Sequence, residues 1–324
     1  MATSFERQHI GIVMPNQGAT VDGLSTQLVE LERLGFDSAW MPGIPNGPDV
    51  LTLLAVAGRA TSRIELGTAV VPTYPRHPVA LAAQALTTNA ALAGRLTLGI
   101  GVSHQVVIER QYGLDYRHPV AHLREYLQVL RPLLATQSVD FAGEYFRSRI
   151  RLDIDTGGVA APPVIIAALA PRMLQLAGEV ADGTVTFMCG LITARDHIVP
   201  GITAAAEAAG RPAPQVVLGM PVLCTDDVAA GRAVAAQEFA LYGRLPAYRA
   251  MMTNEGAAGP EDVVVIGNES AIAGAVTAAF AAGVTHFQAT PFGTPDDIAR
   301  TIACLACLRQ GRTSVPDPLY ATPR

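Results

Sequence analysis

The residues best suited to chemistry lie in the segment "RLTLGIGVSHQ", residues 95–105. A β-prone run there ends in Gly99-Ile100-Gly101, which is how a dinucleotide-binding fingerprint begins. That fingerprint has a third glycine three residues later, where this chain has His104. A histidine just beyond a strand end can be a general acid or base, and it can equally be an ordinary hydrogen-bonded side chain. The segment therefore indicates a ligand site of some kind without naming the ligand.

Arg172 belongs to a second candidate site, the segment "ALAPRML". A β-prone run there leads into a helix whose first turn contains Ala170, Pro171 and Arg172. Free backbone N–H groups, the helix dipole and a guanidinium group together favour phosphate binding. A helix with proline in its first turn and a surface arginine fits the same residues equally well. The loop "VVPTYPRHP" is stiffened by three prolines, and it indicates either a ligand wall or a rigid turn.

The histidine and cysteine pairs of the chain give weaker signals. His118 and His122 have the spacing of a zinc pair, but the acidic partner of an H-E-x-x-H motif is missing, so no metal site is predicted. Cys304 and Cys307 form a C-x-x-C pattern inside a helical stretch, where buried apolar cysteine is the commoner case. The sequence has no G-x-S-x-G or Walker motif, which argues against covalent hydrolase chemistry.

Composition sets the outer limits on function. The 324 residues are 50% hydrophobic and 16% charged, so we expect a large buried core. The formal net charge of -5 provides no general attraction to nucleic acid or to an anionic membrane. We find no apolar run long enough to span a bilayer and no signal-peptide core at the start of the chain. The four cysteines suit a reducing compartment. We therefore expect a cytoplasmic protein whose partner is a small-molecule substrate, not nucleic acid or a membrane.

Short β-rich runs alternate with longer alanine-rich helical segments along the chain. In the first helical segment, residues 22–35, leucines recur at helical spacing and Gly35 marks the end. Eight β-then-α units predict an α/β fold of the TIM (β/α)8 barrel type, in a single domain covering residues 1–324. Two insertions interrupt the alternation, a β-hairpin at about residues 139–148 and a segment at about residues 240–262 that could cover the barrel mouth. The predicted strands are residues 9–14, 36–42, 64–72, 95–101, 162–169, 182–188, 214–226 and 284–292.

The active site of a TIM barrel lies at the carboxyl ends of its strands. This rule selects a short list of segments, each following one predicted strand. They are Pro15 and Asn16, Met41 to Ile44, residues 69–77, residues 99–105, residues 168–173 and residues 187–190.

Several longer strings resemble one known family. They are "ELERLGFDSAWMP", "IELGTAVVPTYPRHPVALAAQALTTNAALAGRLTLGIGVSHQ", "REYLQVLRPLL", "DFAGEYF" and "LAPRMLQLAGEVADGTVTFM". Together they are similar to the bacterial luciferase-like family, and within it to the actinobacterial oxidoreductases that use the deazaflavin coenzyme F420. The resemblance covers nearly the whole chain, roughly residues 10–290, and it also implies the TIM barrel.

The resemblance implies a flavin-type ring at the carboxyl ends of the strands. Relatives commonly have a non-proline cis peptide after the third strand, which would fall at Ala69-Val70. The glycines of the fourth strand would leave room for the flat ring, and the phosphate-bearing tail would meet the turn after the fifth strand. The implied cofactor-binding residues are Ala69, Val70, Val71, Gly99, Gly101, Val102, Ala168, Leu169, Ala170, Pro171, Arg172 and Met173, and the residues expected to border the substrate are Pro15, Met41, His104 and Gln105.

Two departures from the family limit what is carried over. Several relatives have an Asp-His pair after the second strand, where this chain has Gly43-Ile44. Relatives that act on sugar phosphates have a glutamate where this chain has Val102. His104 is then the nearest titratable group and the candidate catalytic residue.

The sequence therefore predicts an F420-dependent oxidoreductase that transfers hydride between the deazaflavin and a small organic substrate. The protein would bind the ring, shield one face of it and orient the substrate against the other. Two alternatives stay open, an FMN-dependent monooxygenase of the same fold and a flavin- or deazaflavin-binding protein without turnover. Because relatives often dimerise, we also expect a homodimer.

Overall fold

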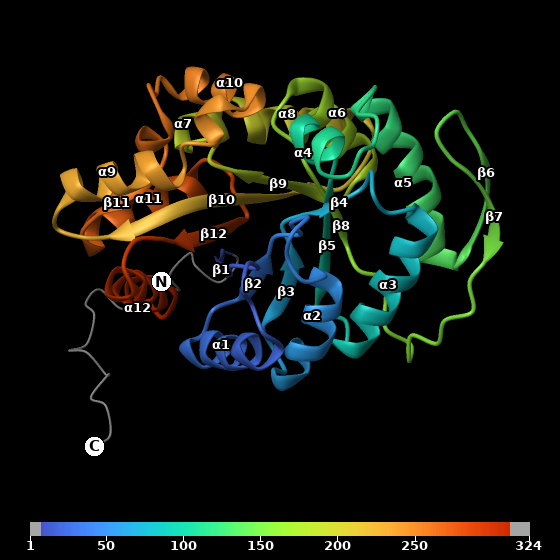
Figure 1. Ribbon diagram of the computed structural model, residues 1–324, viewed down its shortest axis with the longest axis horizontal. Helices are drawn as coiled ribbons and strands as arrows, with labels where there is room; N and C mark the ends of the chain where they lie inside the picture. The colour runs from blue at the N-terminus through green and yellow to red at the C-terminus, as the bar shows by residue number, and fades with distance from the viewer. Residues whose placement is uncertain (1–7, 312–324) are drawn as a thin grey trace.

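The structure is a computed structural model that describes residues 8–311. Eight parallel strands form a closed barrel, so the predicted TIM barrel is confirmed (Figure 1). Each predicted strand segment contains one of them. In barrel order the strands are β1 (His9–Val13), β2 (Ser38–Met41), β3 (Glu65–Thr68), β5 (Leu96–Gly101), β8 (Val164–Ala167), β9 (Gly183–Phe187), β10 (Gln215–Cys224) and β12 (His286–Pro291), and β12 pairs with β1.

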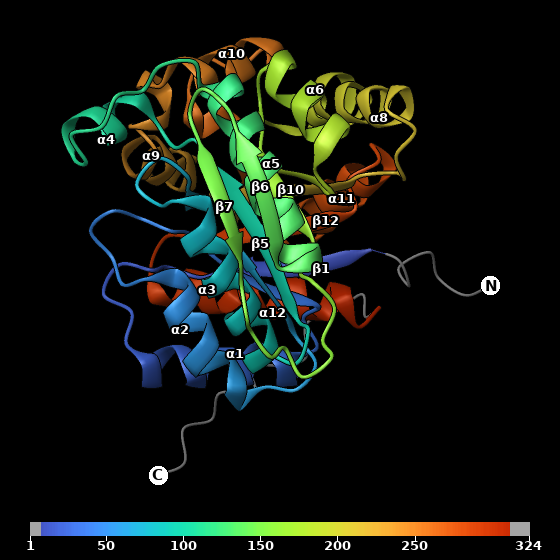
Figure 2. The same ribbon diagram turned by 90° about the vertical axis from the view of Figure 1, so that its right-hand side faces the viewer.

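Helices surround the barrel and cover the outer faces of its strands (Figures 1 and 2). The first of them begins at the cap residue Thr20 and ends at Gly35, whose φ of 89° is left-handed, as expected for a C-terminal glycine. The longer helices are α1 (Val21–Leu34), α2 (Val50–Ala57), α3 (Pro78–Ala91), α5 (Pro119–Thr136), α6 (Pro171–Val180), α8 (Val199–Ala208), α9 (Val228–Glu238), α10 (Pro246–Glu255), α11 (Glu269–Ala281) and α12 (Pro295–Arg309); the shorter ones are η2 (Gly58–Ala60), α4 (Gln105–Arg110), α7 (Leu191–Thr193), η3 (Ala194–Ile198), η4 (Tyr242–Arg244) and η5 (Pro260–Asp262).

Alternate residues of each strand point into the barrel, as strand geometry requires. On β2, Trp40 points inward and its ring crosses the barrel beside Gly67, where an added Cβ would lie 2.3 Å from the indole. Its neighbour Met41 points outward and is fully buried between the barrel and the helices. The barrel is therefore filled by side chains, and ligands have access only at its ends.

Both insertions are present as ordered elements. The hairpin consists of β6 (Ser138–Ala142) and β7 (Arg147–Arg151), and it lies along the outside of α5 (Figure 2). Glu125 of α5 accepts hydrogen bonds from three backbone N–H groups at the hairpin tip. The second insertion contains η4, α10 and η5. The short strand β11 (Val265–Gly267) follows it and pairs with β10. This strand is not among the predicted ones.

The strand β4 (Val71–Pro72) continues the line of β3 after an interruption of two residues. Among residues 8–311, the structure contains no helix with both the length and the apolar character needed to cross a membrane.

Candidate active site at the carboxyl end of the barrel

A β-bulge separates β3 from β4. Gly67 pairs with Thr97 of β5, and Val71 pairs with Ile100. The segment from β3 to β4 therefore contains one residue more than the segment of β5 that it pairs with. The extra length pushes Ala69 and Val70 out of the sheet, and both are half-buried. The peptide bond between them is cis, as the family resemblance implied.

Thr68 satisfies the backbone groups that the bulge leaves without ladder partners. Its hydroxyl accepts a hydrogen bond from the N–H of Gly99 at 2.9 Å and donates one to the carbonyl of the same residue at 2.7 Å. Because Thr68 is fully buried, an unpaired backbone group at this point would have no water to replace its partner. One side chain therefore takes the place of two ladder hydrogen bonds.

Glycines leave the space into which the bulge fits. A Cβ on Gly99 would lie 1.9 Å from the carbonyl oxygen of Thr68, and one on Gly101 would lie 2.8 Å from Val70 Cγ2. On the other side, a Cβ on Gly43 would lie 2.9 Å from the carbonyl oxygen of Val70. The two glycines of β5 thus make room for the bulge. We call the surface formed by Ala69, Val70, Gly43 and Gly101 the bulge shelf.

Asn16 fixes the loop that faces the shelf. Its side-chain amide donates hydrogen bonds to the carbonyl oxygens of Pro42 at 2.8 Å and of Pro48 at 3.2 Å. Gly43 lies between these two acceptors, so Asn16 holds the loop after β2 in contact with the bulge.

The loop after β5 carries His104, which is half-buried and precedes the first turn of α4. Its imidazole does not cap that helix, and it lies 5.8 Å, between ring centroids, from Tyr248 of α10. Burial lowers the pKa of His104 below its ordinary value. Burial also raises the pKa of Tyr248, and Tyr242 and Cys189 raise it further. At neutral pH the pair is therefore a neutral imidazole beside a protonated phenol.

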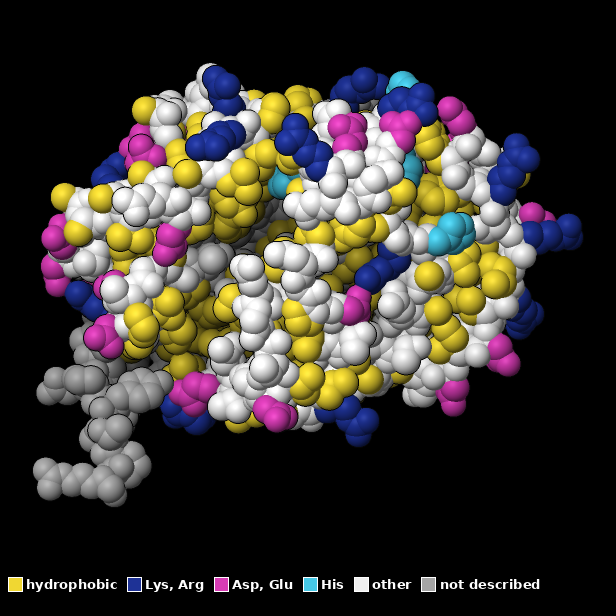
Figure 3. All heavy atoms as spheres, in the orientation of Figure 1, with side chains coloured by type: hydrophobic (Ala, Val, Ile, Leu, Met, Phe, Trp, Pro, Cys, Tyr) yellow, Lys and Arg dark blue, Asp and Glu magenta, His cyan; other side chains and the backbone are white. Residues whose placement is uncertain are grey.

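Tyr248 reaches His104 from the far side of the barrel mouth. Its ring packs against Tyr242 at 4.8 Å, and Tyr242 packs against Phe187, the last residue of β9, at 5.2 Å. In the same region Figure 3 shows a hollow lined mainly by hydrophobic side chains, below the segment that contains α7 and α10. The second insertion therefore covers part of the mouth with aromatic rings, as was expected of it.

The N-terminus of α6 is open. Ala170 is its cap residue and Pro171 and Arg172 follow, all three of them exposed; within the described part of the chain, no side chain caps this helix and no carboxylate pairs with Arg172. The carbonyl of Leu169, just before the helix, accepts a hydrogen bond from His197 Nε2 at 2.8 Å. Pro171 has no N–H group and the Met173 N–H donates to the Ala170 carbonyl at 3.0 Å, which leaves the backbone N–H and the guanidinium of Arg172 as the donors of this turn. These are donors that suit an anion.

The N-terminus of α7, which follows the neighbouring strand β9, is occupied by a carboxylate of the chain. Glu255 at the end of α10 accepts hydrogen bonds from the N–H groups of Ile192 at 3.0 Å and Thr193 at 2.6 Å. A Cβ on Gly190 would lie 2.2 Å from this carboxyl group, so that the glycine is needed for its close approach. The chain's own carboxylate fills the position that an anionic ligand would take.

The predicted site residues divide into three groups by exposure. Ala69, Val70, Val102, His104 and Leu169 are half-buried, and Pro15, Gln105, Ala170, Pro171 and Arg172 are exposed; Met41, Val71, Gly99, Gly101, Ala168 and Met173 are buried. Four side chains of the last group, those of Met41, Val71, Ala168 and Met173, pack in the core. Their burial in this core is an observation that the sequence did not predict, and their roles in ligand binding stay predictions. Gln105 donates a hydrogen bond to Glu109 one turn further along α4.

Comparison with known proteins settles the family. A family model described as luciferase-like monooxygenase matches residues 8–313. The chain belongs to the luciferase-like family. The F420-dependent glucose-6-phosphate dehydrogenase of Mycolicibacterium fortuitum is 32% identical over 214 residues, which cover 59% of this chain and 62% of that protein. The family resemblance read from the sequence is thus confirmed.

Two solved structures of low sequence identity share the fold of this luciferase-like chain. The coenzyme F420-dependent tetrahydromethanopterin reductase from Methanopyrus kandleri has a TM-score of 0.77 at 21% identity, covering 94% of this chain and 98% of that one. The oxygenating constituent of 3,6-diketocamphane monooxygenase from Pseudomonas putida, in complex with FMN, has a TM-score of 0.75 at 18% identity, covering 96% and 100%.

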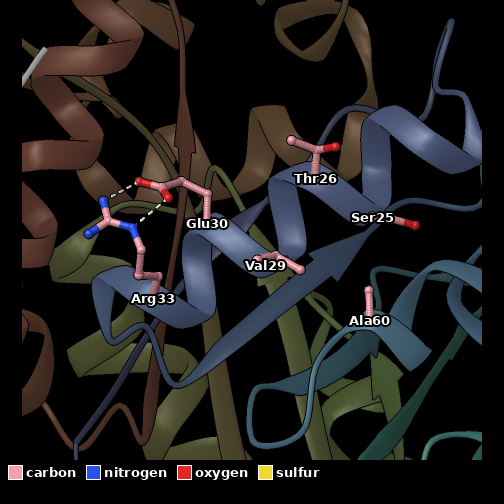
Figure 4. A pocket seen from close by; sticks show the side chains of 6 residues that line it. All are labelled: Ser25, Thr26, Val29, Glu30, Arg33 and Ala60. Atoms are coloured by element: carbon pink, nitrogen blue, oxygen red, sulfur yellow. Dashed lines mark hydrogen bonds and ion pairs between the residues drawn. The ribbon is translucent and has the colours of Figure 1, made fainter. Parts of the chain in front are cut away.

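Other features singled out in the sequence lie apart from this site. His122 is buried and stacked on Tyr74 at 4.0 Å between ring centroids, whereas His118 is exposed, so the two do not form a metal site. Cys304 is buried in α12. A hollow on the outer face of α1, lined by Val29, the ion pair of Glu30 with Arg33, and Ala60, is open and shallow (Figure 4).

Four contributors to the site were not predicted. They are Thr68 of β3, His197 of η3, and Tyr248 and Glu255 of α10. Thr68 directly precedes Ala69 and Val70, and this position is the only feature of the sequence that could have indicated its role. The others act through contacts with residues 28 to 144 positions away in the chain, which no local pattern records.

Proposed function

We propose that this luciferase-like protein binds coenzyme F420 on the bulge shelf and transfers hydride between the deazaflavin and a small organic substrate. Support comes from the relative named above, an F420-dependent dehydrogenase, and from the F420-dependent reductase that shares the fold. The stronger support is the arrangement of this chain's own residues, which fit a flat ring joined to an anionic tail.

The observation that carries the proposal is the position of Gly101. An added Cβ there would lie 2.8 Å from Val70 Cγ2 and 3.1 Å from the Cβ of Ala167. Val70 belongs to the bulge shelf, and Ala167 is the last residue of β8, three positions before the cap of α6. The shelf therefore borders the end of β8, and two residues separate this end from the cap of α6. A ring on the shelf would place its tail at Arg172.

The open helix end fits the tail phosphate by the chemistry of its donors. Arg172 supplies a guanidinium, which suits phosphate in geometry and charge, and its backbone N–H in the exposed first turn is a further donor. His197 Nε2 donates a hydrogen bond to the Leu169 carbonyl oxygen. Without this bond, the partial negative charge of that oxygen would repel an anion at this point. Histidine here acts on the loop and not on the phosphate itself.

When bound, the deazaflavin supplies the hydride chemistry. The protein shields one face of the ring with Val70 and covers the opposite part of the mouth with Tyr248. His104, neutral because burial lowers its pKa, can accept on a ring nitrogen the proton that a substrate hydroxyl loses, and return it in the reverse reaction. Tyr248, whose phenol stays protonated, can donate a hydrogen bond to a substrate oxygen. The mostly hydrophobic lining favours a small substrate with few charges (Figure 3).

An FMN-dependent monooxygenase is the second candidate, because a neighbour of similar TM-score was solved with FMN. Equilibrium titration with each cofactor, followed by fluorescence, separates the two. We expect micromolar or tighter binding of F420, and binding of FMN alone would refute the proposal. If F420 binds but reduced F420 transfers hydride to none of a panel of quinones, enones and imines, and the oxidised form accepts none from alcohols, the non-catalytic alternative gains support.

Arg172→Ala tests the anion site. We expect F420 affinity to fall by about 1–3 kcal/mol, since a charge-assisted hydrogen bond to phosphate is lost. Arg59→Ala is the matched control, because Arg59 is also an exposed arginine at a helix but lies outside the barrel mouth. Equal affinities of the two variants would remove the assignment of Arg172. The homodimer and the cytoplasmic location stay predictions.

A further inference from the structure

Three chemistry-bearing side chains meet at the amino end of the barrel, opposite the candidate active site. His9 begins β1, Glu65 begins β3 and His286 begins β12. His9 and His286 are register partners on neighbouring strands. Because Gly11, Gly67 and Gln288 face the barrel interior, strand alternation turns the residues two positions earlier inward as well. The three side chains therefore form the floor of the barrel, at the seam where its first and last strands join.

The distances between these groups suit a shared ion better than direct bonding. One nitrogen of each histidine and one carboxylate oxygen all lie within 4.8 Å of one another. His9 Nδ1 is 3.9 Å from the Glu65 carboxylate, which is too far for a hydrogen bond. This nitrogen is buried and has no hydrogen-bond partner. A single bridging ion or molecule between this nitrogen and the carboxylate would give both a partner.

Thr285 is an outer hydrogen-bond partner of His286. Its hydroxyl is 2.7 Å from His286 Nδ1 and accepts from the Val216 N–H at 2.9 Å. The Val216 carbonyl accepts from the Thr285 N–H at 3.0 Å and lies 3.1 Å from the hydroxyl, so the hydroxyl can accept from or donate to Nδ1. When Nδ1 is the donor, Nε2 keeps its lone pair for a metal ion. Such outer partners fix the tautomer of histidine ligands in metal sites.

We propose that His9, Glu65 and His286 form a binding site for a divalent transition-metal ion, with zinc as the preferred occupant. Two imidazoles and one carboxylate are a donor set that zinc uses, with water in the fourth position. Metal–ligand bonds of about 2.0–2.2 Å require the donors to draw slightly closer than they stand. Glu65 can supply this movement, because its side chain is 46% exposed. The ion ties β12 and β1 to β3 and so stabilises the closure of the barrel.

The residues of this floor lie at the opposite end of the barrel from the bulge shelf, so the site is independent of the proposed function. The end of a TIM barrel where strands begin serves stability more often than chemistry. The predicted effect of the metal is accordingly on thermal stability and not on turnover. No sequence motif indicates this site, because its proposed ligands are separated by 56 and 221 positions.

The test uses tag-free full-length protein, freed of metal with EDTA and then titrated with zinc. We expect the protein to retain about one zinc ion per chain after gel filtration, and its thermal midpoint to rise with zinc concentration, as binding to the folded state requires. Magnesium, which prefers oxygen ligands, should give no such rise. Absence of retained zinc, or a rise that zinc and magnesium produce equally, would overturn the proposal.

Two ligand variants and one control locate the binding. Glu65→Gln and His9→Asn should each weaken zinc binding by about tenfold or more, since loss of even an outer partner has effects of that size. His118→Asn removes an exposed histidine elsewhere and should bind zinc as the wild type does. Circular dichroism of the metal-free variants establishes that they are folded; Glu65, being half-exposed, is the variant expected to fold normally. Unchanged zinc binding in folded Glu65→Gln contradicts the proposed site.

Discussion

The two halves of the barrel mouth differ in what lines them. On the side of β3, β5 and β8, the lining is backbone and small side chains: the bulge shelf, Gly101 and the uncapped start of α6. On the side of β9 and β10, it is side chains from the second insertion: Tyr248 beside His104, and Glu255 on the start of α7. We call these the open half and the closed half. Both contain a helix N-terminus that follows a barrel strand, and only the surroundings distinguish them.

The difference teaches that a helix dipole alone does not make an anion site. The N-terminus of α7 also follows a barrel strand, but a carboxylate of the chain already accepts its N–H groups. A second anion there would meet like charge, whereas α6 offers the backbone N–H and the guanidinium of Arg172. The open half therefore receives the cofactor in our account, and the closed half covers the substrate.

The largest expected effect concerns the glycine under the bulge. Gly99→Ala would place a Cβ 1.9 Å from the Thr68 carbonyl oxygen, which is backbone and has nowhere to move. We expect a loss of about 3–5 kcal/mol in the free energy of unfolding, measured by urea denaturation. Gly274→Ala in α11 is the control, since nothing lies within 4 Å of its added Cβ; it should be neutral or stabilising by up to about 1 kcal/mol. Similar losses in both would show that the open half is not specially constrained.

Thr68→Val removes the hydroxyl that supports the bulge and keeps the side-chain shape. It leaves the N–H and carbonyl groups of Gly99 unpaired in a buried position, and we expect it to lower the free energy of unfolding by about 2–3 kcal/mol. Thr68→Ser keeps both hydrogen bonds and should lose about 1 kcal/mol or less. If valine is tolerated as well as serine, the hydroxyl does not hold the open half in shape.

Glu255→Ala tests the closed half in the same way. Two N–H groups at the start of α7 would lose their acceptor, with a cost of about 1–2 kcal/mol in thermal or urea unfolding. Glu207→Ala, at an exposed position of α8, should stay within about 0.5 kcal/mol of wild type. The affinity for F420 should be unchanged in both variants. A marked change in Glu255→Ala would mean that the cofactor's anion extends to the closed half.

The smallest effect concerns the contact that joins the halves. Burial disfavours the charged imidazole, so His104 should titrate in NMR spectra below its ordinary pKa of 6.5. Tyr248→Ala removes the ring that covers it and admits water, which favours the charged form and should raise the pKa of His104 towards its ordinary value. His104→Asn assigns the resonance. If Tyr248→Ala leaves the pKa of His104 unchanged, Tyr248 does not shield that imidazole from water.

Much of the fold could be predicted from the sequence because it follows from local patterns. The strands read from hydrophobic runs all lie in the barrel, and the end of α1 at Gly35 needs only one left-handed residue. The open start of α6 is also local, since Ala170, Pro171 and Arg172 are consecutive. The bulge at Ala69 and Val70 came from family resemblance and not from the residues.

The rest depends on contacts between distant parts of the chain. Met41 was expected at the substrate because it ends a strand, but the period of two sends its side chain outward while Trp40 points inward. The occupation of α7 by Glu255 spans more than sixty positions, and no pattern near either residue announces it. The closed half was therefore predictable only as an insertion near the mouth, whereas its function in our account rests on side-chain contacts.

The most direct test of the account compares F420 with the same deazaflavin lacking the phosphate-bearing tail, each titrated into wild type and Arg172→Ala. If the ring lies on the bulge shelf and the phosphate at α6, the substitution should weaken F420 by about 1–3 kcal/mol and leave the tailless compound unaffected. Equal weakening of both compounds, or no weakening of F420, would contradict the placement of the cofactor on the open half.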